Sequence, residues 1–221
     1  MSDIFEEVDE AVQQDKATKL WKNISGFVYV GIAALILGVA GYEVYGWQTA
    51  QKKEKDSREF FLAKSALDKK DYTLAEALFE EILASDSSFS EIAGNFLAET
   101  RLSGLGDKAS ALEALKKAAE GEGPYADIAR IKAGYLMSDS ASVADLETYL
   151  APVANNFDSP YKELAQEIVA ARAFSLGDYD EAERRFEIIS LAVDVSAGVR
   201  GRAERALIAI DAIKAKNGTP S

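Results

Sequence analysis

Three segments of this chain resemble one another and recur at a regular spacing. They are KDYTLAEALFEEIL (Lys70–Leu83), GDKASALEALKKAA (Gly106–Ala119) and GDYDEAERRFEIIS (Gly177–Ser190). In each, a polar turn leads to a small residue, a bulky apolar residue follows four positions later, and an apolar or small residue three positions after that. The triplets are Ala75, Phe79 and Ile82; Ala111, Leu115 and Ala118; and Ala182, Phe186 and Ile189; a weaker copy is Leu146, Leu150 and Val153. Equivalent positions are 36, 35 and 36 residues apart, which indicates a repeat protein.

This triplet spacing places three side chains on one face of a helix. The small residue lets a second helix approach closely, and the bulky residue fills the space beside it. One hairpin of two helices cannot bury its apolar face alone, so neighbouring hairpins must stack into a solenoid. We therefore expect an all-α chain with about four hairpins, which resembles the tetratricopeptide repeat; an irregular helical bundle is the alternative. The turn Gly177–Tyr179 matches that repeat best, whereas Lys70 and Lys108 depart from it.

The last predicted helix, at about 196–215, is amphipathic in the way that a terminal helix of a solenoid requires. Its apolar residues fall on one face, and basic and acidic residues occupy the rest. The apolar set is Val199, Ala203, Ala206, Leu207, Ile210 and Ile213. We expect this helix to cap the repeats.

A run without charged residues extends from Ile24 to Tyr42. As a helix it would be ~28 Å long, close to the thickness of the hydrocarbon core of a bilayer. Trp21 precedes the run, and Tyr45 and Trp47 follow it, where aromatic residues anchor at the membrane interface. A cleaved signal peptide fits poorly, because the preceding segment is long and acidic. The sequence predicts one transmembrane helix over residues 24–47.

Small residues also gather on one face of this predicted transmembrane helix. They are Gly31, Ala34, Gly38 and Gly41. Such a face permits close packing against another membrane helix, although glycine is frequent in membrane helices in any case. Lysines flank the segment on both sides in near-equal number, so the charge distribution does not fix its orientation.

The remaining segments complete the predicted domain organisation. Residues 1–23 form a short acidic segment with an amphipathic pattern at Ile4, Phe5, Val8 and Val12, which suits either a protein partner or a partly ordered tail. Residues 48–57 are a charged connector that could continue the helix. Residues 58–216 form the repeat domain, and residues 217–221 form a tail.

The composition argues against catalysis. The chain contains no histidine and no cysteine, so imidazole bases, thiol nucleophiles, thiolate metal sites and disulfides are excluded. Its net charge of −12 argues against a sequence-independent grip on nucleic acid. Paired carboxylates such as Glu80-Glu81 lie on helix faces that are expected to be solvated, without a phosphate loop or metal-ligand spacing. We expect no enzyme activity, cofactor, metal or small-molecule substrate.

The order of these parts has a counterpart in a known family. The opening MSDIFEEVDEAV, the Leu20-Trp21-Lys22 before the membrane run, the single membrane helix and the four divergent hairpins resemble the ancillary Sec translocon subunit family (YfgM-like proteins) in its alphaproteobacterial form. The resemblance implies an inner-membrane protein with residues 1–23 in the cytoplasm and residues 51–221 in the periplasm. It also implies two partners, the Sec translocon and a membrane-anchored periplasmic chaperone.

Two functions follow as hypotheses. The first is a scaffold or co-chaperone beside the translocon that binds a chaperone or emerging clients; the second is a structural coordinator of cell-envelope assembly or division. A groove on the concave face would suit unfolded segments or a helix of a partner. The expected contact residues are Phe60, Phe96, Ile131 and Tyr135, with Phe174 in the last hairpin. The alternative is that these residues are ordinary core.

Overall fold

The computed structural model describes residues 3–193 and 195–217, and within these ranges it contains helices and no strand. The elements are α1 (Asp3–Asp68), α2 (Tyr72–Ala84), α3 (Ser90–Glu99), the π-helical turn η1 (Thr100–Gly104), α4 (Lys108–Ala118), α5 (Pro124–Met137), α6 (Val143–Ala154), α7 (Lys162–Ser175), α8 (Tyr179–Leu191) and α9 (Ala197–Asn217). The chain divides into two compact units, Met1–Glu54 and Lys55–Ser221. The predicted all-α fold is confirmed.

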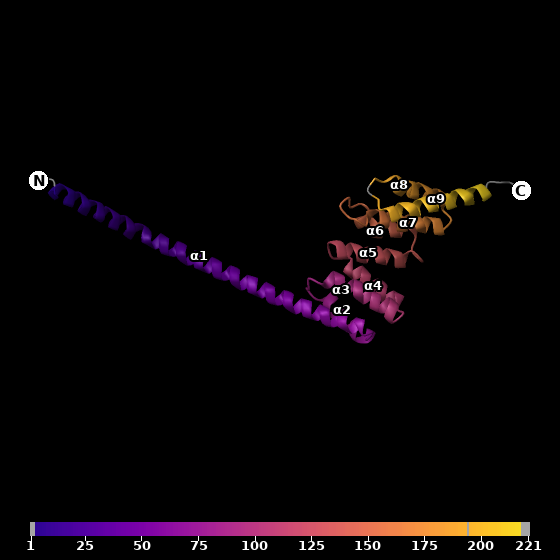
Figure 1. Cartoon of the computed structure of the whole chain (residues 1–221), viewed down its shortest axis with the longest axis horizontal. Coiled ribbons are helices and arrows are strands. Elements are labelled where there is room, and N and C mark those ends of the chain that lie inside the picture. Colours follow the sequence, from indigo (N-terminus) through magenta and orange to yellow (C-terminus); the bar gives the residue numbers. More distant parts are fainter. Residues whose placement is uncertain (1–2, 194, 218–221) are drawn as a thin grey trace. The chain divides into compact units, whose positions relative to one another are not determined.

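The first unit is the N-terminal part of α1 (Figure 1). Among the described residues, one helix is long and apolar enough to cross a membrane, and it contains the predicted span. Its apolar side chains are exposed; Phe27, for example, is 82% exposed. A bilayer would cover such a surface. The predicted acidic amphipathic face at Ile4, Phe5, Val8 and Val12 lies outside the residues whose side chains are described, as does the predicted tail from residue 218 on.

The second unit contains the predicted hairpins (Figure 1). The last part of α1, from Lys55, pairs with α2; α3 and η1 pair with α4; α5 pairs with α6; and α7 pairs with α8. Across hairpins, α3 packs on α5, α5 on α7 and α7 on α9. The described residues thus form four stacked hairpins, followed by one further helix that packs on the last hairpin. The expected C-terminal cap is α9.

The four triplets form the interior of these hairpins. All twelve of their side chains are at most 4% exposed. Close approach is visible at Gly134 of α5, where an added Cβ would lie 2.8 Å from Leu150 Cδ2 of α6. At Gly94 of α3 an added Cβ would lie 2.5 Å from the Cβ of Ala118 in α4. Small residues therefore set the distance between helices, as the sequence predicted.

The turns of the first and last hairpins have the same hydrogen bonds. Lys70 and Gly177 both have a left-handed backbone, with φ of 61° and 78°. In the first turn, the amide of Asp71 donates to the oxygen of Ala66 at 3.0 Å, and in the last, the amide of Asp178 donates to Ala173 at 3.1 Å. This is the Schellman arrangement that ends helices. Each aspartate then caps the next helix with its side chain.

The second hairpin differs at its turn. The turn η1 extends α3 with a wider backbone loop, in which the amide of Leu105 donates to the oxygen of Thr100 at 3.1 Å. A π turn accommodates one more residue than an α turn and is frequent at functional sites. This turn places Leu102 and Ser103 beside α5, where a cavity lies.

Candidate functional site

Two adjoining cavities lie on the side of the repeat unit formed by α3 and α5. The larger, of about 320 Å³, is mainly apolar and is bordered by Ala98, Leu102, Ser103, Leu115, Tyr135 and Leu136. The smaller, of about 210 Å³, is bordered by Ile92, Phe96, Tyr125 and Ile128. Asn95, Glu99 and Lys132 border both. We call this surface the α3–α5 groove.

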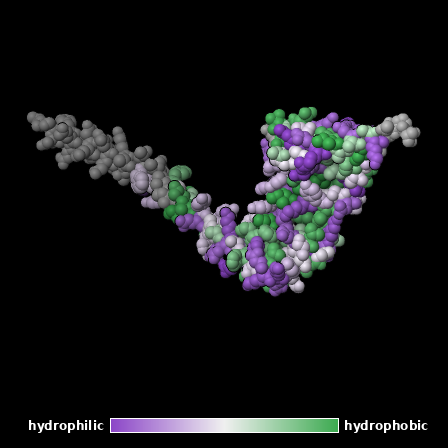
Figure 2. Space-filling view, turned by 45° about the vertical axis from the view of Figure 1, so that its right-hand side comes forward, coloured by the Kyte–Doolittle hydropathy of each residue, from purple (hydrophilic) through white to green (hydrophobic). Residues whose placement is uncertain are grey.

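Large apolar side chains in the groove are open to solvent. Tyr125 is 49% exposed, Tyr135 48% and Leu102 40%. Apolar and polar residues are mixed on the surface of the repeat unit. On the face shown in Figure 2, hydrophobic patches are bounded by hydrophilic residues. Exposed aromatic and apolar side chains around a cavity are typical of surfaces that bind other proteins.

Asn95 is the buried polar residue of the groove, at 6% exposure. Its Nδ2 donates to the backbone oxygens of Glu91, at 2.9 Å, and of Tyr125, at 3.0 Å. Because both neighbours are acceptors, the nitrogen must face them, and this fixes the orientation of the amide. The other atom, Oδ1, is buried and has no hydrogen-bond partner among the described residues.

Charged groups stand at the mouth of the groove. Glu99 and Lys132 are both exposed, and neither forms an ion pair within the described part of the chain. Farther along the same row of helices, Arg202 of α9 holds Glu167 of α7 with two bonds of 2.6 and 2.7 Å. Burial raises the pKa of Tyr135, and the carboxylate of Glu167 raises it further, while Arg202 opposes this. Tyr135 is therefore a neutral hydroxyl at physiological pH, available as donor or acceptor.

The structure places the five residues that were predicted to contact a partner in different environments. Tyr135 is half-exposed and borders the larger cavity, and Phe96 borders the smaller one. Phe60 is partly buried and packs on Phe96 with ring centroids 5.7 Å apart. Ile131 is 5% exposed and belongs to the core around α6 and α7, so it is not available to a partner in this structure. Phe174 packs edge-on against Tyr179 in the last hairpin, away from the groove.

Sequence reasoning missed Asn95, Glu99, Leu102, Tyr125, Ile128 and Lys132. Helical spacing could have found the set on α5, since Tyr125, Ile128 and Lys132 follow at i, i+3 and i+7 and so share a face. The predicted small-residue face of the membrane helix is exposed in the first unit. Among the described residues, none lies within 4 Å of a Cβ added at Gly31, Gly38 or Gly41.

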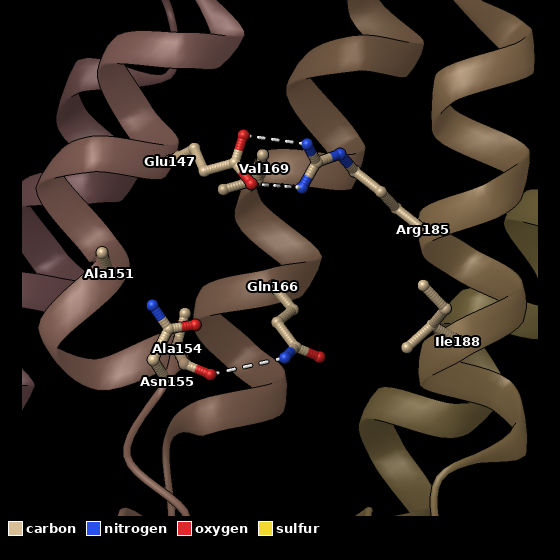
Figure 3. A pocket seen from close by; sticks show the side chains of 8 residues that line it. All are labelled: Glu147, Ala151, Ala154, Asn155, Gln166, Val169, Arg185 and Ile188. Carbon is tan, nitrogen blue, oxygen red and sulfur yellow. Dashed lines mark hydrogen bonds and ion pairs between the residues drawn. The ribbon is translucent and has the colours of Figure 1, made fainter.

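A third cavity, of about 170 Å³, lies between α6, α7 and α8 (Figure 3). Its charged side chains already have partners: Arg185 pairs with Glu147 at 3.0 Å and with Glu181 at 2.5 Å. Gln166 reaches the backbone oxygen of Ala154 at 3.4 Å. With its charges satisfied internally, this cavity offers a ligand less than the groove does. Within the described residues no three Asp, Glu, His or Cys side chains are grouped as a metal site requires.

A stack of helical hairpins with an open apolar groove defines a helical-repeat protein, a class whose members bind other proteins. The family model of the tetratricopeptide repeat-like domain matches residues 16–145, more than half of the chain, and the chain belongs to this family. Its repeat domain is therefore an interaction module for protein partners. No curated protein and no solved structure matches the chain.

Proposed function

We propose that this protein is a membrane-anchored scaffold that captures polypeptide partners in the α3–α5 groove. The observation that carries the proposal is the groove itself, an apolar cavity of about 320 Å³ with Tyr135 and Leu102 half-exposed at its edge. A tyrosine that is neither buried nor fully solvated loses its remaining contact with water when a partner covers it. Such anchors often contribute 2 kcal/mol or more to an interface.

The resemblance to the ancillary Sec translocon subunits supplies the proposed setting. The membrane helix anchors the protein in the inner membrane, with its N-terminus in the cytoplasm and the repeat domain in the periplasm. The partners are then the Sec translocon and a membrane-anchored periplasmic chaperone, and the clients are chains that emerge from the translocon. The span of α1 that can cross a membrane and the match to the repeat family both fit this setting.

The test compares groove variants with a matched control. Tyr135→Ser and Leu102→Ser remove exposed apolar surface from the groove, while Leu74→Ser removes a side chain of similar exposure, 48%, from α2. The full-length protein is purified in mild detergent, and the captured proteins and the thermal midpoint are measured for each variant. The groove variants should lose translocon and chaperone partners with unchanged melting, and the control should keep them.

Two results would overturn this proposal. Full capture by both groove variants would exclude the groove as the working surface. Capture of enzymes of wall synthesis, in place of the translocon, would favour the coordinator of envelope assembly. The orientation has its own test, because a reporter that is active only in the periplasm, fused after Ser221, should be active.

A further inference from the structure

The most exposed apolar side chains of the repeat unit lie at two of its loops. Phe157, between α6 and α7, and Val193, between α8 and α9, are both 88% exposed, and Leu191 at the end of α8 is 81% exposed. Every other large apolar side chain that the structure describes in this unit is at most 69% exposed. These three residues, which we call the loop patch, are as open to solvent as Phe27 in the predicted membrane span.

The two loops form one surface. A cavity of about 400 Å³ lies between them, bordered by Phe157 from one loop and by Ser196 and Val199 from the start of α9. Both loops lie on the same side of the repeat unit (Figure 1). The guanidinium of Arg200 donates to the backbone oxygen of Ala192 at 2.7 Å, which holds the loop between α8 and α9 in place.

The loop patch lies at the end of the stack where the chain enters the repeat unit. At that end, each loop that leads into a new hairpin contacts the start of the preceding one. The carboxylate of Asp56 accepts from the amide of Ser88, between α2 and α3, at 3.2 Å. The hydroxyl of Ser159, between α6 and α7, donates to Asp127 in the first turn of α5 at 2.8 Å. The loops of the last two hairpins are therefore at the same end as Lys55, where the unit begins.

The length of the chain limits how far this end can be from a bilayer. Lys55 follows Trp47, the last residue of the predicted span, by eight positions. Even a fully extended chain would keep Lys55 within ~30 Å of the membrane interface. A short tether of this kind gives the surface near its attachment point a high effective concentration at the bilayer.

We propose that the loop patch inserts into the interface of the lipid bilayer and forms a second membrane contact of the protein. This inference rests on the membrane anchor of the proposed function but does not depend on the α3–α5 groove. Phe157, Leu191 and Val193 supply the inserted side chains. With this contact formed, the end of the repeat unit that holds the loops faces the membrane.

The shape of the loop patch favours lipid over a protein partner. Anchors in protein interfaces lie in well-packed surroundings that exclude water. Phe157 and Val193 have few neighbours, as their exposure of 88% shows. Fluid acyl chains need no such surroundings, because they conform to side chains that project from a loop. Exposed apolar patches of this kind mark either membrane or protein contacts, and the isolation of these side chains selects the first.

Charges of both signs surround the loop patch. The Nζ of Lys162 lies 4.3 Å from the ring centroid of Phe157, and Asp158 and Glu163 border the same cavity as that ring. A lysine beside an inserted ring can extend its ammonium group to the lipid phosphates. Because the carboxylates oppose it, attraction to anionic headgroups contributes little, and the contact depends on the burial of apolar surface.

The experiment measures the depth of single labels in the full-length protein. The chain contains no cysteine, so one introduced cysteine carries the only nitrobenzoxadiazole label. The protein is placed, one copy per disc, in phosphatidylcholine nanodiscs whose acyl chains are brominated near the headgroups. Interfacial apolar groups lie about 5–10 Å deep, so these lipids should quench a label at Val193→Cys at least about threefold more than one at Leu176→Cys. Leu176, 56% exposed, is the matched control in the turn between α7 and α8, at the opposite end of the last hairpin.

Replacement of the neighbouring side chains tests whether they cause the insertion. In the protein labelled at position 193, the double replacement Phe157→Ser and Leu191→Ser should reduce quenching to the level seen at position 176. Ile208→Ser, which removes a side chain that is 69% exposed from the middle of α9, should leave the quenching unchanged. Mixing phosphatidylglycerol into the discs should change little, and quenching that requires this anionic lipid would contradict apolar insertion.

The remaining outcomes separate this inference from the membrane anchor. A label at Leu37→Cys, within the predicted span, reports on the anchor itself. Quenching at position 37 with equal, low quenching at 193 and 176 overturns the loop contact and leaves the anchor. Absence of quenching at position 37 overturns both. A label at position 193 that is shielded from aqueous iodide, yet not quenched by brominated lipid, would show that protein covers the loop patch and would also overturn the inference.

Discussion

The first and last hairpins share the geometry of their turns, but the two ends of the repeat unit are held together by different side chains. In the first region, four phenylalanine rings pack on one another with centroids 5.1 to 5.9 Å apart. They are Phe60, Phe79, Phe89 and Phe96. In the last region, ion pairs join successive helices, and the bonds of Arg202 to Glu167 and of Lys214 to Asp180 and Glu183 measure 2.6 to 2.7 Å.

The difference shows which features of a helical repeat are common to both regions and which contacts can vary. Both regions keep the buried triplet, with Ala75 and Ala182 at equivalent places and both fully buried. Both also keep the Schellman turn with its capping aspartate. The contacts between hairpins are free to be aromatic or ionic. The family model ends at residue 145, before the ion pairs of Arg185, Arg202 and Lys214 begin.

The largest loss of stability is expected when a phenylalanine is removed from equivalent positions in the two ends of the repeat unit. Phe79→Ala and Phe186→Ala each remove a buried ring from a triplet, and each should lower the free energy of unfolding by about 3–5 kcal/mol. Phe79 also packs on Phe60 and Phe96, so its loss should cost about 0.5–1.5 kcal/mol more for each ring pair. Urea unfolding of the full-length protein, followed by circular dichroism, measures both. Changes within about 0.5 kcal/mol would show that the triplets are not the core.

An intermediate effect is expected at the ionic region. Arg202→Ala leaves the carboxylate of Glu167, only 8% exposed, without its partner. Breaking a buried pair costs about 3–5 kcal/mol, but the Arg202 side chain is 46% exposed, and solvent screening should reduce the loss to about 1–3 kcal/mol.

The matched control for that pair is Lys214→Ala, whose partner Asp180 is 89% exposed, so this variant should lose less stability than Arg202→Ala does. The same unfolding measurement applies to both variants. If the two losses were equal, the pair of Arg202 and Glu167 would be no more than a surface contact.

The smallest effect concerns the two turns and should have opposite signs. Lys70 adopts a left-handed backbone that disfavours side chains by about 1–2 kcal/mol, while Gly177 adopts the same backbone without that cost. Lys70→Gly should therefore raise the thermal midpoint and Gly177→Ala should lower it. Part of each change is offset by the greater freedom of glycine in the unfolded chain, so about 1 kcal/mol remains. Shifts of the same sign would contradict the shared turn geometry.

Much of the fold could be predicted because it is encoded locally. A small residue and two larger ones at helical spacing identify a buried face wherever they occur, and all four triplets are buried. Only part of the groove could be predicted from the sequence in the same way. An asparagine on a helix resembles any solvated residue in sequence, whereas Asn95 is buried and donates to the backbone oxygen of Tyr125, thirty residues away. The π turn at Thr100–Gly104 has no compositional signal, because no residue type marks a turn that is one residue wider than an α turn.

Most contacts in the repeat unit join neighbouring helices or equivalent helices of successive hairpins, within the described residues. This restriction has a consequence for how the chain acquires its structure. Loops that close over short stretches of sequence form quickly, so folding should be fast and should start wherever one hairpin docks on another. As the chain lengthens during synthesis, the aromatic core of α1 to α4 contains all its own members before α7 exists. The early part can therefore fold stably while the later part is still being synthesised. Little apolar surface of the incomplete chain then stays exposed to solvent.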